Sequence, residues 1–121
     1  MALKILLVDD DESHALLSQL LLQRLGFIVQ VCTNGFEAEQ VFQAAPESFY
    51  IVASDYSMDR MDGLELARRV LAINPRVRFL LLTGYDHPEM LREAKKIGVR
   101  QVSLKPISME EFDDIIKSMD R

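Results

Sequence analysis

The 121-residue chain has a single cysteine, no block of basic residues and no long apolar run. Because Cys32 stands alone, a disulfide within the chain and a cysteine-based metal site are both excluded. The 14 Lys and Arg residues are outnumbered by 19 Asp and Glu residues, so the formal net charge is −5 and direct nucleic-acid binding has no electrostatic support. A run of about 18 uncharged apolar residues, which a membrane span needs, does not occur. We therefore expect neither a nucleic-acid partner nor a membrane association.

The apolar start of the chain is too short for a signal peptide, because Asp9, Asp10 and Asp11 follow Val8 at once. We therefore expect a soluble cytoplasmic protein. Cys32 lies in the apolar stretch "FIVQVC", so we expect it to be a small buried side chain. A length of 121 residues with 49% hydrophobic residues is typical of one compact domain. We expect a single domain over residues 1–121, either free-standing or cut from a longer chain.

Short apolar runs alternate along the chain with segments in which apolar residues recur at helical spacing. The runs that predict strands are Ile5–Val8, Phe27–Cys32, Phe49–Asp55, Val77–Thr83 and Val99–Leu104. The segments that predict helices contain Leu17, Leu20, Leu21 and Leu25 on one face before Gly26; Phe36, Val41, Phe42 and Ala45 before Pro46; Gly63–Ile73; Pro88–Gly98; and Phe112, Ile115, Ile116 and Met119 after a Ser108–Glu111 capping box.

Five apolar strands alternating with five helices indicate a parallel sheet covered by helices on both faces. We therefore predict a doubly wound α/β fold. In such a sheet ligands bind beyond the carboxyl ends of the strands, so the residues that end the strands are the candidates for chemistry. These residues are Asp9 and Asp10, Asp55, Thr83 and Lys105.

Three carboxylates at one edge of a sheet repel one another, and a hard divalent cation such as Mg²⁺ relieves that repulsion. Asp9, Asp10 and Asp55 are therefore candidate magnesium ligands. Asp55 is also a candidate carboxylate nucleophile toward phosphorus. The Thr83 hydroxyl and the Lys105 ammonium would neutralise charge on the oxygens of a transferred phosphoryl group.

The motifs "DD" after the first strand, "DYSMDRMDG", "LLLTG" and "LKPIS" stand in an order and at spacings that resemble the receiver domain of two-component response regulators. The resemblance covers essentially the whole chain. It implies a flavodoxin-like sheet with strand order 2-1-3-4-5, Asp55 as phosphoacceptor, and Mg²⁺ bound by Asp9, Asp10 and the backbone carbonyl of Ser57. It also implies Thr83 as switch hydroxyl, Lys105 as phosphate-binding ammonium, and a cis Lys105–Pro106 bond.

By the same resemblance, the partners are a histidine kinase or phosphotransfer protein as donor and an unidentified downstream protein that reads residues 88–119. Residues 1–121 would be a single receiver domain without an output domain, and the chain would be a monomer or weak dimer. It would be a signalling receiver that assists its own phosphotransfer and dephosphorylation, and not an enzyme acting on other substrates.

Two positions near the site depart from the family pattern. Asp59 stands where the family usually has proline, and Val102 stands where many members have an aromatic residue that couples the threonine to the output surface. We therefore expect any switch to act through the loop after Thr83 and the helix that follows.

Simpler interpretations apply to several motif residues. Asp11 is read as a helix N-cap, and Asp62–Gly63 as a turn and helix start in which Gly63 supplies backbone freedom. Thr83 alone is an ordinary strand residue, and Lys105 alone an ordinary surface charge.

Two other functional classes remain open from the sequence. One is a pseudo-receiver, an interaction module of the same fold that is not phosphorylated. The other is an aspartyl phosphohydrolase similar to the haloacid-dehalogenase class, which requires an Asp two residues after the nucleophile, where this chain has Ser57.

Overall fold

The computed structural model describes residues 3–85 and 87–119, so residues 1, 2, 86, 120 and 121 of the predicted domain lie outside the described part. Strands and helices alternate along the chain, as predicted. The strands are β1 (Lys4–Val8), β2 (Ile28–Cys32), β3 (Ile51–Asp55), β4 (Arg78–Thr83) and β5 (Gln101–Leu104). The helices are α1 (Glu12–Arg24), α2 (Gly35–Ala44), α3 (Gly63–Ile73), α4 (Pro88–Ile97) and α5 (Met109–Met119).

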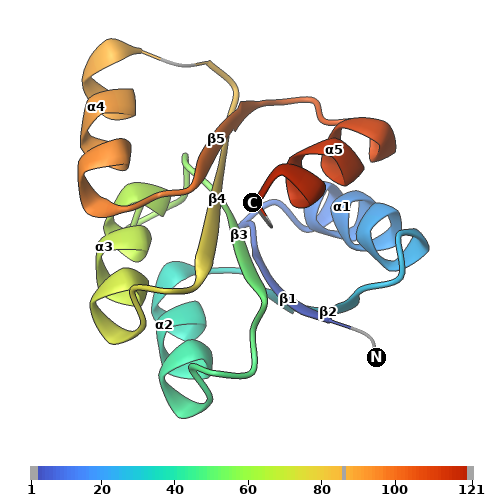
Figure 1. Cartoon of the computed structure of the whole chain (residues 1–121), viewed down its shortest axis with the longest axis horizontal. Coiled ribbons are helices and arrows are strands. Elements are labelled where there is room, and N and C mark those ends of the chain that lie inside the picture. The colour runs from blue at the N-terminus through green and yellow to red at the C-terminus, as the bar shows by residue number, and fades with distance from the viewer. Residues whose placement is uncertain (1–2, 86, 120–121) are drawn as a thin grey trace.

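The strands form one parallel sheet in the order β2-β1-β3-β4-β5. Helices α1 and α5 cover one face of this sheet, and α2, α3 and α4 cover the other (Figure 1). This arrangement confirms the predicted doubly wound fold. The strand order reverses direction between β1 and β3, and this switch point is where such sheets bind their ligands.

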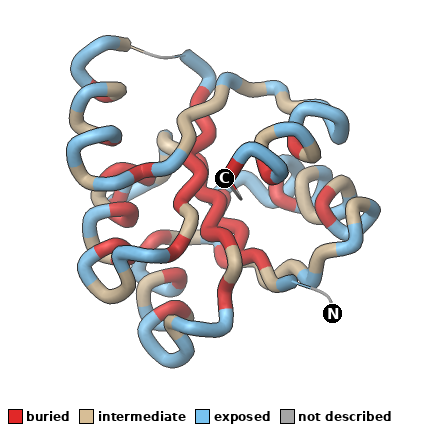
Figure 2. The backbone as a smooth tube through the Cα atoms, in the orientation of Figure 1, coloured by how far each residue is buried: buried red, intermediate tan, exposed pale blue. Residues whose placement is uncertain are grey.

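The sheet separates two hydrophobic clusters. Successive strand residues point to opposite faces, so Leu6 packs with the α2, α3 and α4 side, whereas Ile5 and Leu7 pack with α1 and α5. Figure 2 shows the strands as the buried centre of the molecule, with exposed residues concentrated on the outer surfaces of the helices and loops. The expected burial of Cys32 is confirmed, since 1% of its surface is exposed.

The predicted core faces of α1 and α2 are wrong in part. In α1, Leu17 and Leu20 are 58% and 51% exposed, and the buried residues are Ala15 and Leu22. Leucines occupy five of the positions 16 to 22 of α1, so apolar residues surround the helix and their spacing does not select one face.

In α2, Phe36 is 45% exposed and Ala45 is also exposed, while Ala38 and Phe42 face the core. The Phe36 ring is covered from outside by the guanidinium of Arg69, 5.7 Å from the ring centroid. This cation–π contact accommodates a large aromatic side chain that the core does not take.

The predicted helix ends are confirmed. Asp11 caps α1 by accepting a hydrogen bond from the His14 amide at 3.1 Å, and Ser108 and Glu111 exchange the two bonds of a capping box at the start of α5. Pro88 begins α4, and Gly98 ends it at a φ of 101°. Within residues 3–85 and 87–119, no helix is long and apolar enough to cross a membrane.

Candidate functional site

Four adjacent strands bring the predicted site residues to one edge of the sheet. Asp9 follows β1, Asp55 ends β3, Thr83 ends β4 and Lys105 follows β5. The parallel register aligns these ends, because Val8 pairs with Ser54, Asp55 pairs with Leu82, and Thr83 pairs with Leu104. The fold therefore places side chains from distant parts of the sequence at the switch point of the sheet.

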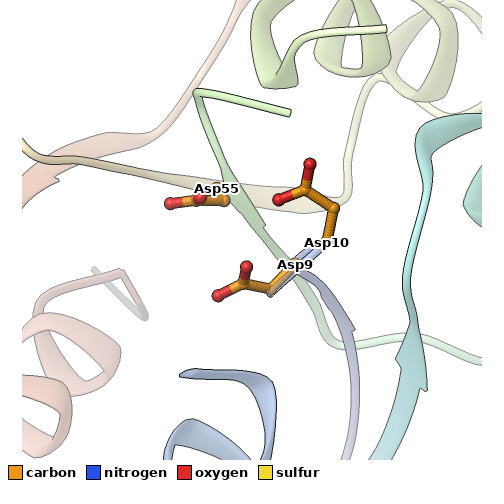
Figure 3. Close-up of side chains that lie close together, drawn as sticks. All are labelled: Asp9, Asp10 and Asp55. Atoms are coloured by element: carbon orange, nitrogen blue, oxygen red, sulfur yellow. The ribbon is translucent and has the colours of Figure 1, made fainter. Parts of the chain in front are cut away.

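Three carboxylates gather at this edge. Oxygen atoms of Asp9, Asp10 and Asp55 lie within 4.8 Å of one another (Figure 3). Asp9 and Asp55 are 5% and 7% exposed, whereas Asp10 is exposed. Two of the three acids are therefore largely removed from the water that would otherwise screen their repulsion.

Asp9 is held in an unfavourable electrostatic setting. Burial raises the pKa of its carboxyl above the ordinary value, and the nearby Asp55 charge raises it further, against the opposing effect of the Asp11 backbone N–H. That N–H donates a hydrogen bond to Asp9 Oδ1 at 2.9 Å. The site thus contains a buried anion that one amide and the Lys105 charge only partly compensate.

Lys105 approaches Asp55 directly. Its ammonium forms an ion pair with Asp55 Oδ1, and both side chains are mostly buried. The Lys105 backbone N–H donates to the Thr83 carbonyl at 2.8 Å, which ties the start of the β5–α5 loop to the end of β4. The Lys105–Pro106 peptide bond is cis, which confirms the isomer that the resemblance implied.

The Thr83 side chain bonds to the backbone of the loop that follows β4. Its hydroxyl donates to the backbone carbonyl of Tyr85 at 2.6 Å. Thr83 is 4% exposed, and the Tyr85 N–H also donates to its hydroxyl at 3.4 Å, so the buried hydroxyl has both a donor and an acceptor in the backbone of Tyr85. Because a hydroxyl has one hydrogen to donate, donation to another acceptor requires the bond to the Tyr85 carbonyl to break.

The loop from β3 to α3 is fixed tightly behind Asp55. The Tyr56 N–H donates to the Leu82 carbonyl at 2.7 Å, and the Gly63 N–H donates to the Tyr56 carbonyl at 2.8 Å. A Cβ atom on Gly63 would lie 2.3 Å from the Asp55 carbonyl oxygen. The predicted helix start with Asp62 as N-cap is confirmed, but close packing, rather than backbone freedom, explains why Gly63 is glycine.

A cavity of about 560 Å³ opens beside these residues. Asp55, Ser57, Thr83 and Lys105 contribute to its wall, so Ser57 lies on the same cavity as the predicted phosphoacceptor. Apolar side chains line much of the rest of the wall, including Leu17 and Leu21 of α1, Ile107, and Phe112 of α5. The Asp55 carboxylate thus lies on a cavity with a largely apolar wall.

The donor set fits a hard divalent cation. All three side chains offer oxygen, the donor type that Mg²⁺ prefers, and they come within coordinating reach of a common point. A bound cation would offset the electrostatic free energy that it costs to keep Asp9 charged beside Asp55. The residues present therefore fit Mg²⁺.

Sequence reasoning missed the backbone hydrogen bonds that hold the side chains of the site. The amides of Asp11 and Asp59 donate to the Asp9 and Asp10 carboxylates, and the Tyr85 carbonyl accepts from Thr83. Every residue carries such backbone groups, so side-chain identity gives no signal for them. The close approach of Gly63 had a signal in the "DG" pair, which we interpreted as a turn.

The chain matches known proteins across most of its length. A family model described as "Response regulator receiver domain" matches residues 5–117. The transcriptional regulatory protein ZraR of Escherichia coli is 32% identical over 117 residues, which cover 97% of this chain but 25% of that protein. Sporulation initiation phosphotransferase F of Bacillus subtilis is 29% identical over 115 residues, covering 94% of this chain and 90% of that protein.

The fold also matches a solved structure with a modified aspartate. A response regulator protein from Burkholderia pseudomallei, with a phosphorylated aspartic acid, a calcium ion and citrate, superposes with a TM-score of 0.85. It is 28% identical, and the match covers 94% of this chain and 66% of that chain. This chain spans about a quarter of the length of the ZraR proteins.

Proposed function

The chain belongs to the response regulator receiver domain family of two-component signalling, and on that basis we propose that Asp55 is its phosphoacceptor. The observation that carries the proposal is the convergence of Asp55, Lys105 and the acidic pair Asp9–Asp10 at one sheet edge. The related Burkholderia pseudomallei protein carries a phosphorylated aspartic acid and a calcium ion, which supports the same chemistry here.

In the proposed reaction a carboxylate oxygen of Asp55 attacks the phosphorus of a phosphohistidine or small acyl phosphate. The new O–P bond forms as the bond from phosphorus to the donor breaks, and the donor leaves with that electron pair. Lys105, already paired with Asp55, neutralises charge on the transferred oxygens. The Thr83 hydroxyl leaves the Tyr85 carbonyl and donates to a phosphoryl oxygen. Attack of water on phosphorus later releases phosphate and restores the carboxylate.

Asp9, Asp10, Asp55 and the backbone carbonyl of Ser57 would hold Mg²⁺ in this proposal. When bound, the cation supplies positive charge that offsets the carboxylates and the phosphoryl oxygens. The all-oxygen side-chain donors within 4.8 Å of one another support this assignment.

The proposal extends to the setting of the domain. The donor would be a histidine kinase or a phosphotransfer protein in the cytoplasm, and residues 1–121 would act as one receiver domain that assists its own phosphotransfer and dephosphorylation. A downstream protein would read residues 88–119. Val102, which is half-buried, offers no aromatic ring to couple Thr83 to the surface, so the response would pass through the loop after Thr83 and α4. Unchanged amide spectra over residues 84–107 after phosphorylation would contradict that route.

Intact mass spectrometry tests the proposal. The protein is incubated with a small acyl phosphate, with and without Mg²⁺, and Asp55→Asn serves as the matched variant. We expect one phosphoryl adduct that requires both Mg²⁺ and Asp55. A folded, Mg²⁺-binding protein that forms no adduct would contradict the proposal and favour a pseudo-receiver that binds its partner without phosphorylation.

A further inference from the structure

The loop between β3 and α3 contacts the acidic pair through its backbone. The N–H of Asp59 donates a hydrogen bond to Asp10 Oδ2 at 2.9 Å, between residues 49 positions apart in sequence. Any residue except proline supplies this donor, because the proline nitrogen carries no hydrogen. The bond therefore depends on a feature of residue 59 that is independent of its side-chain charge.

The backbone around Asp59 is bent to present this N–H. The Met61 N–H donates to the Asp59 carbonyl at 2.8 Å, and the intervening Arg60 has a φ of 69°. A three-residue turn with a positive φ at its centre matches the γ-turn, which is rare and strained for a residue other than glycine. Such strain persists where surrounding contacts determine the conformation, and it concentrates at functional sites.

Asp10 is the member of the acidic cluster that most needs positioning. Asp9 and Asp55 are buried and packed at strand ends, whereas Asp10 is exposed and free of such packing. An exposed carboxylate otherwise samples several rotamers, and fixing it on ion binding costs conformational entropy. A carboxylate has about four lone-pair positions, so accepting one N–H leaves it able to bind a cation.

We propose that the backbone N–H of Asp59 positions the Asp10 carboxylate for a divalent cation. The inference rests on the proposed metal site, and it assigns to residue 59 a role in cation affinity. Two effects of the residue are separable. The N–H orients Asp10, and the Asp59 carboxylate adds negative charge at an exposed position, where screening keeps its contribution small.

The test compares Asp59→Ala with Asp59→Pro. Alanine keeps the N–H and removes the charge, while proline removes both, so the difference between the two variants isolates the N–H. Mg²⁺ affinity is measured by titration of amide chemical shifts, without a phosphodonor. We expect Asp59→Ala to bind within about twofold of the parent, and Asp59→Pro to bind roughly threefold to tenfold more weakly than Asp59→Ala. Equal affinities of the two variants would overturn the inference.

Proline also restricts the loop, so a second measurement uses no proline. Hydrogen exchange of the Asp59 amide is compared between the metal-free parent and Asp10→Ala. We expect faster exchange in Asp10→Ala, because the acceptor of the bond is gone, with little change at the Met61 amide. Equal exchange rates at Asp59 would overturn the inference even if Asp59→Pro fails to fold.

Failure of this inference and failure of the proposed phosphoacceptor function give different experimental results. If the parent protein forms no phosphoryl adduct, Asp55 is not the acceptor, but the difference in Mg²⁺ affinity between the two Asp59 variants is still expected. Equal affinities in those variants would remove the role of the N–H and leave the adduct in place.

Discussion

At the residue scale, the most unusual group is a carboxylate buried beside another carboxylate. Asp9 is 5% exposed and lies near Asp55, and both burial and the neighbouring charge raise its pKa. Between the ordinary carboxyl pKa and the raised pKa of Asp9, the folded protein binds more protons at Asp9 than the unfolded chain does. Stability therefore falls as pH rises through that interval, and the full cost is present at neutral pH.

We predict that Asp9→Asn stabilises the metal-free protein at pH 7. Asparagine removes the charge and keeps an oxygen that can accept from the Asp11 N–H. We expect a gain on the order of 1 kcal/mol, or about 3–6 °C in the unfolding midpoint. The gain should shrink as pH falls toward the ordinary carboxyl pKa, because the proton then neutralises Asp9 in the parent as well. Thermal unfolding of both proteins from acidic to neutral pH in EDTA measures this, and a gain that grows at low pH would contradict it.

A second residue-scale feature is the contact between Gly63 and the chain behind Asp55. A Cβ at Gly63 would meet the Asp55 carbonyl oxygen at 2.3 Å and Leu81 Cδ1 at 2.7 Å. The first of these atoms is backbone and cannot rotate away. The position thus couples the start of α3 to the placement of the proposed phosphoacceptor.

We predict that Gly63→Ala lowers the free energy of unfolding by about 2–3 kcal/mol, because overpacking forces the backbone to shift. Denaturant unfolding measures the loss. Gly84→Ala is the matched control, since a Cβ there would have no atom within 4 Å, and it should change stability by about 0.5 kcal/mol or less. Equal stabilities of Gly63→Ala and the parent would mean that the backbone adjusts without cost.

At the element scale, the sequence predicted helix positions better than helix orientations. In α3, Leu64, Ala67, Val70 and Leu71 are all buried as their spacing predicted, and Leu66 is buried beside them. The charged residues of the helix, Glu65, Arg68 and Arg69, lie outside this buried set. Helix α1 offers leucines on several sides, and only contact with the sheet decides which of them is covered. The spacing of apolar residues identifies the core face of a helix only where polar residues occupy the opposite face. Helix α1 lacks that contrast between an apolar and a polar face.

We predict that two leucines on α1 differ strongly in their contribution to stability. Leu22 is 1% exposed and Leu17 is 58% exposed. Leu22→Ala should lower the free energy of unfolding by about 2–4 kcal/mol, because it leaves a cavity in the core under α1 and α5. Leu17→Ala should change it by about 0.5 kcal/mol or less. Both substitutions change the intrinsic helix propensity by the same small amount, in favour of alanine, so propensity cannot separate them. Similar losses in denaturant unfolding would contradict the observed orientation of α1 on the sheet.

At the scale of the whole molecule, the sheet topology assembles a site from four separate segments. The sequence predicted which side chains share this edge, because the rule for parallel sheets needs only the strand ends and their order. It did not predict the hydrogen bonds of Asp59 to Asp10 or of Thr83 to the Tyr85 carbonyl. Those bonds depend on the path of the loops, which side-chain pattern does not encode.

We predict that Mg²⁺ stabilises the folded protein as a whole. A cation that binds only the native state adds about 2.7 kcal/mol at a hundred times its dissociation constant. The unfolding midpoint should therefore rise with Mg²⁺ and return with EDTA, and Asp10→Asn should reduce the rise. Sodium chloride at matched ionic strength controls for general screening. A midpoint that responds equally to both salts would contradict a specific site.

The central claim is that Asp55 receives the phosphoryl group, and chemical trapping tests it most directly. Borohydride reduces an acyl phosphate on aspartate to homoserine, and peptide sequencing then locates the changed residue. After incubation with a small acyl phosphate and Mg²⁺, we expect homoserine at position 55 alone. Homoserine at position 9 or 10, or an adduct that persists in Asp55→Asn, would contradict Asp55 as the phosphoacceptor.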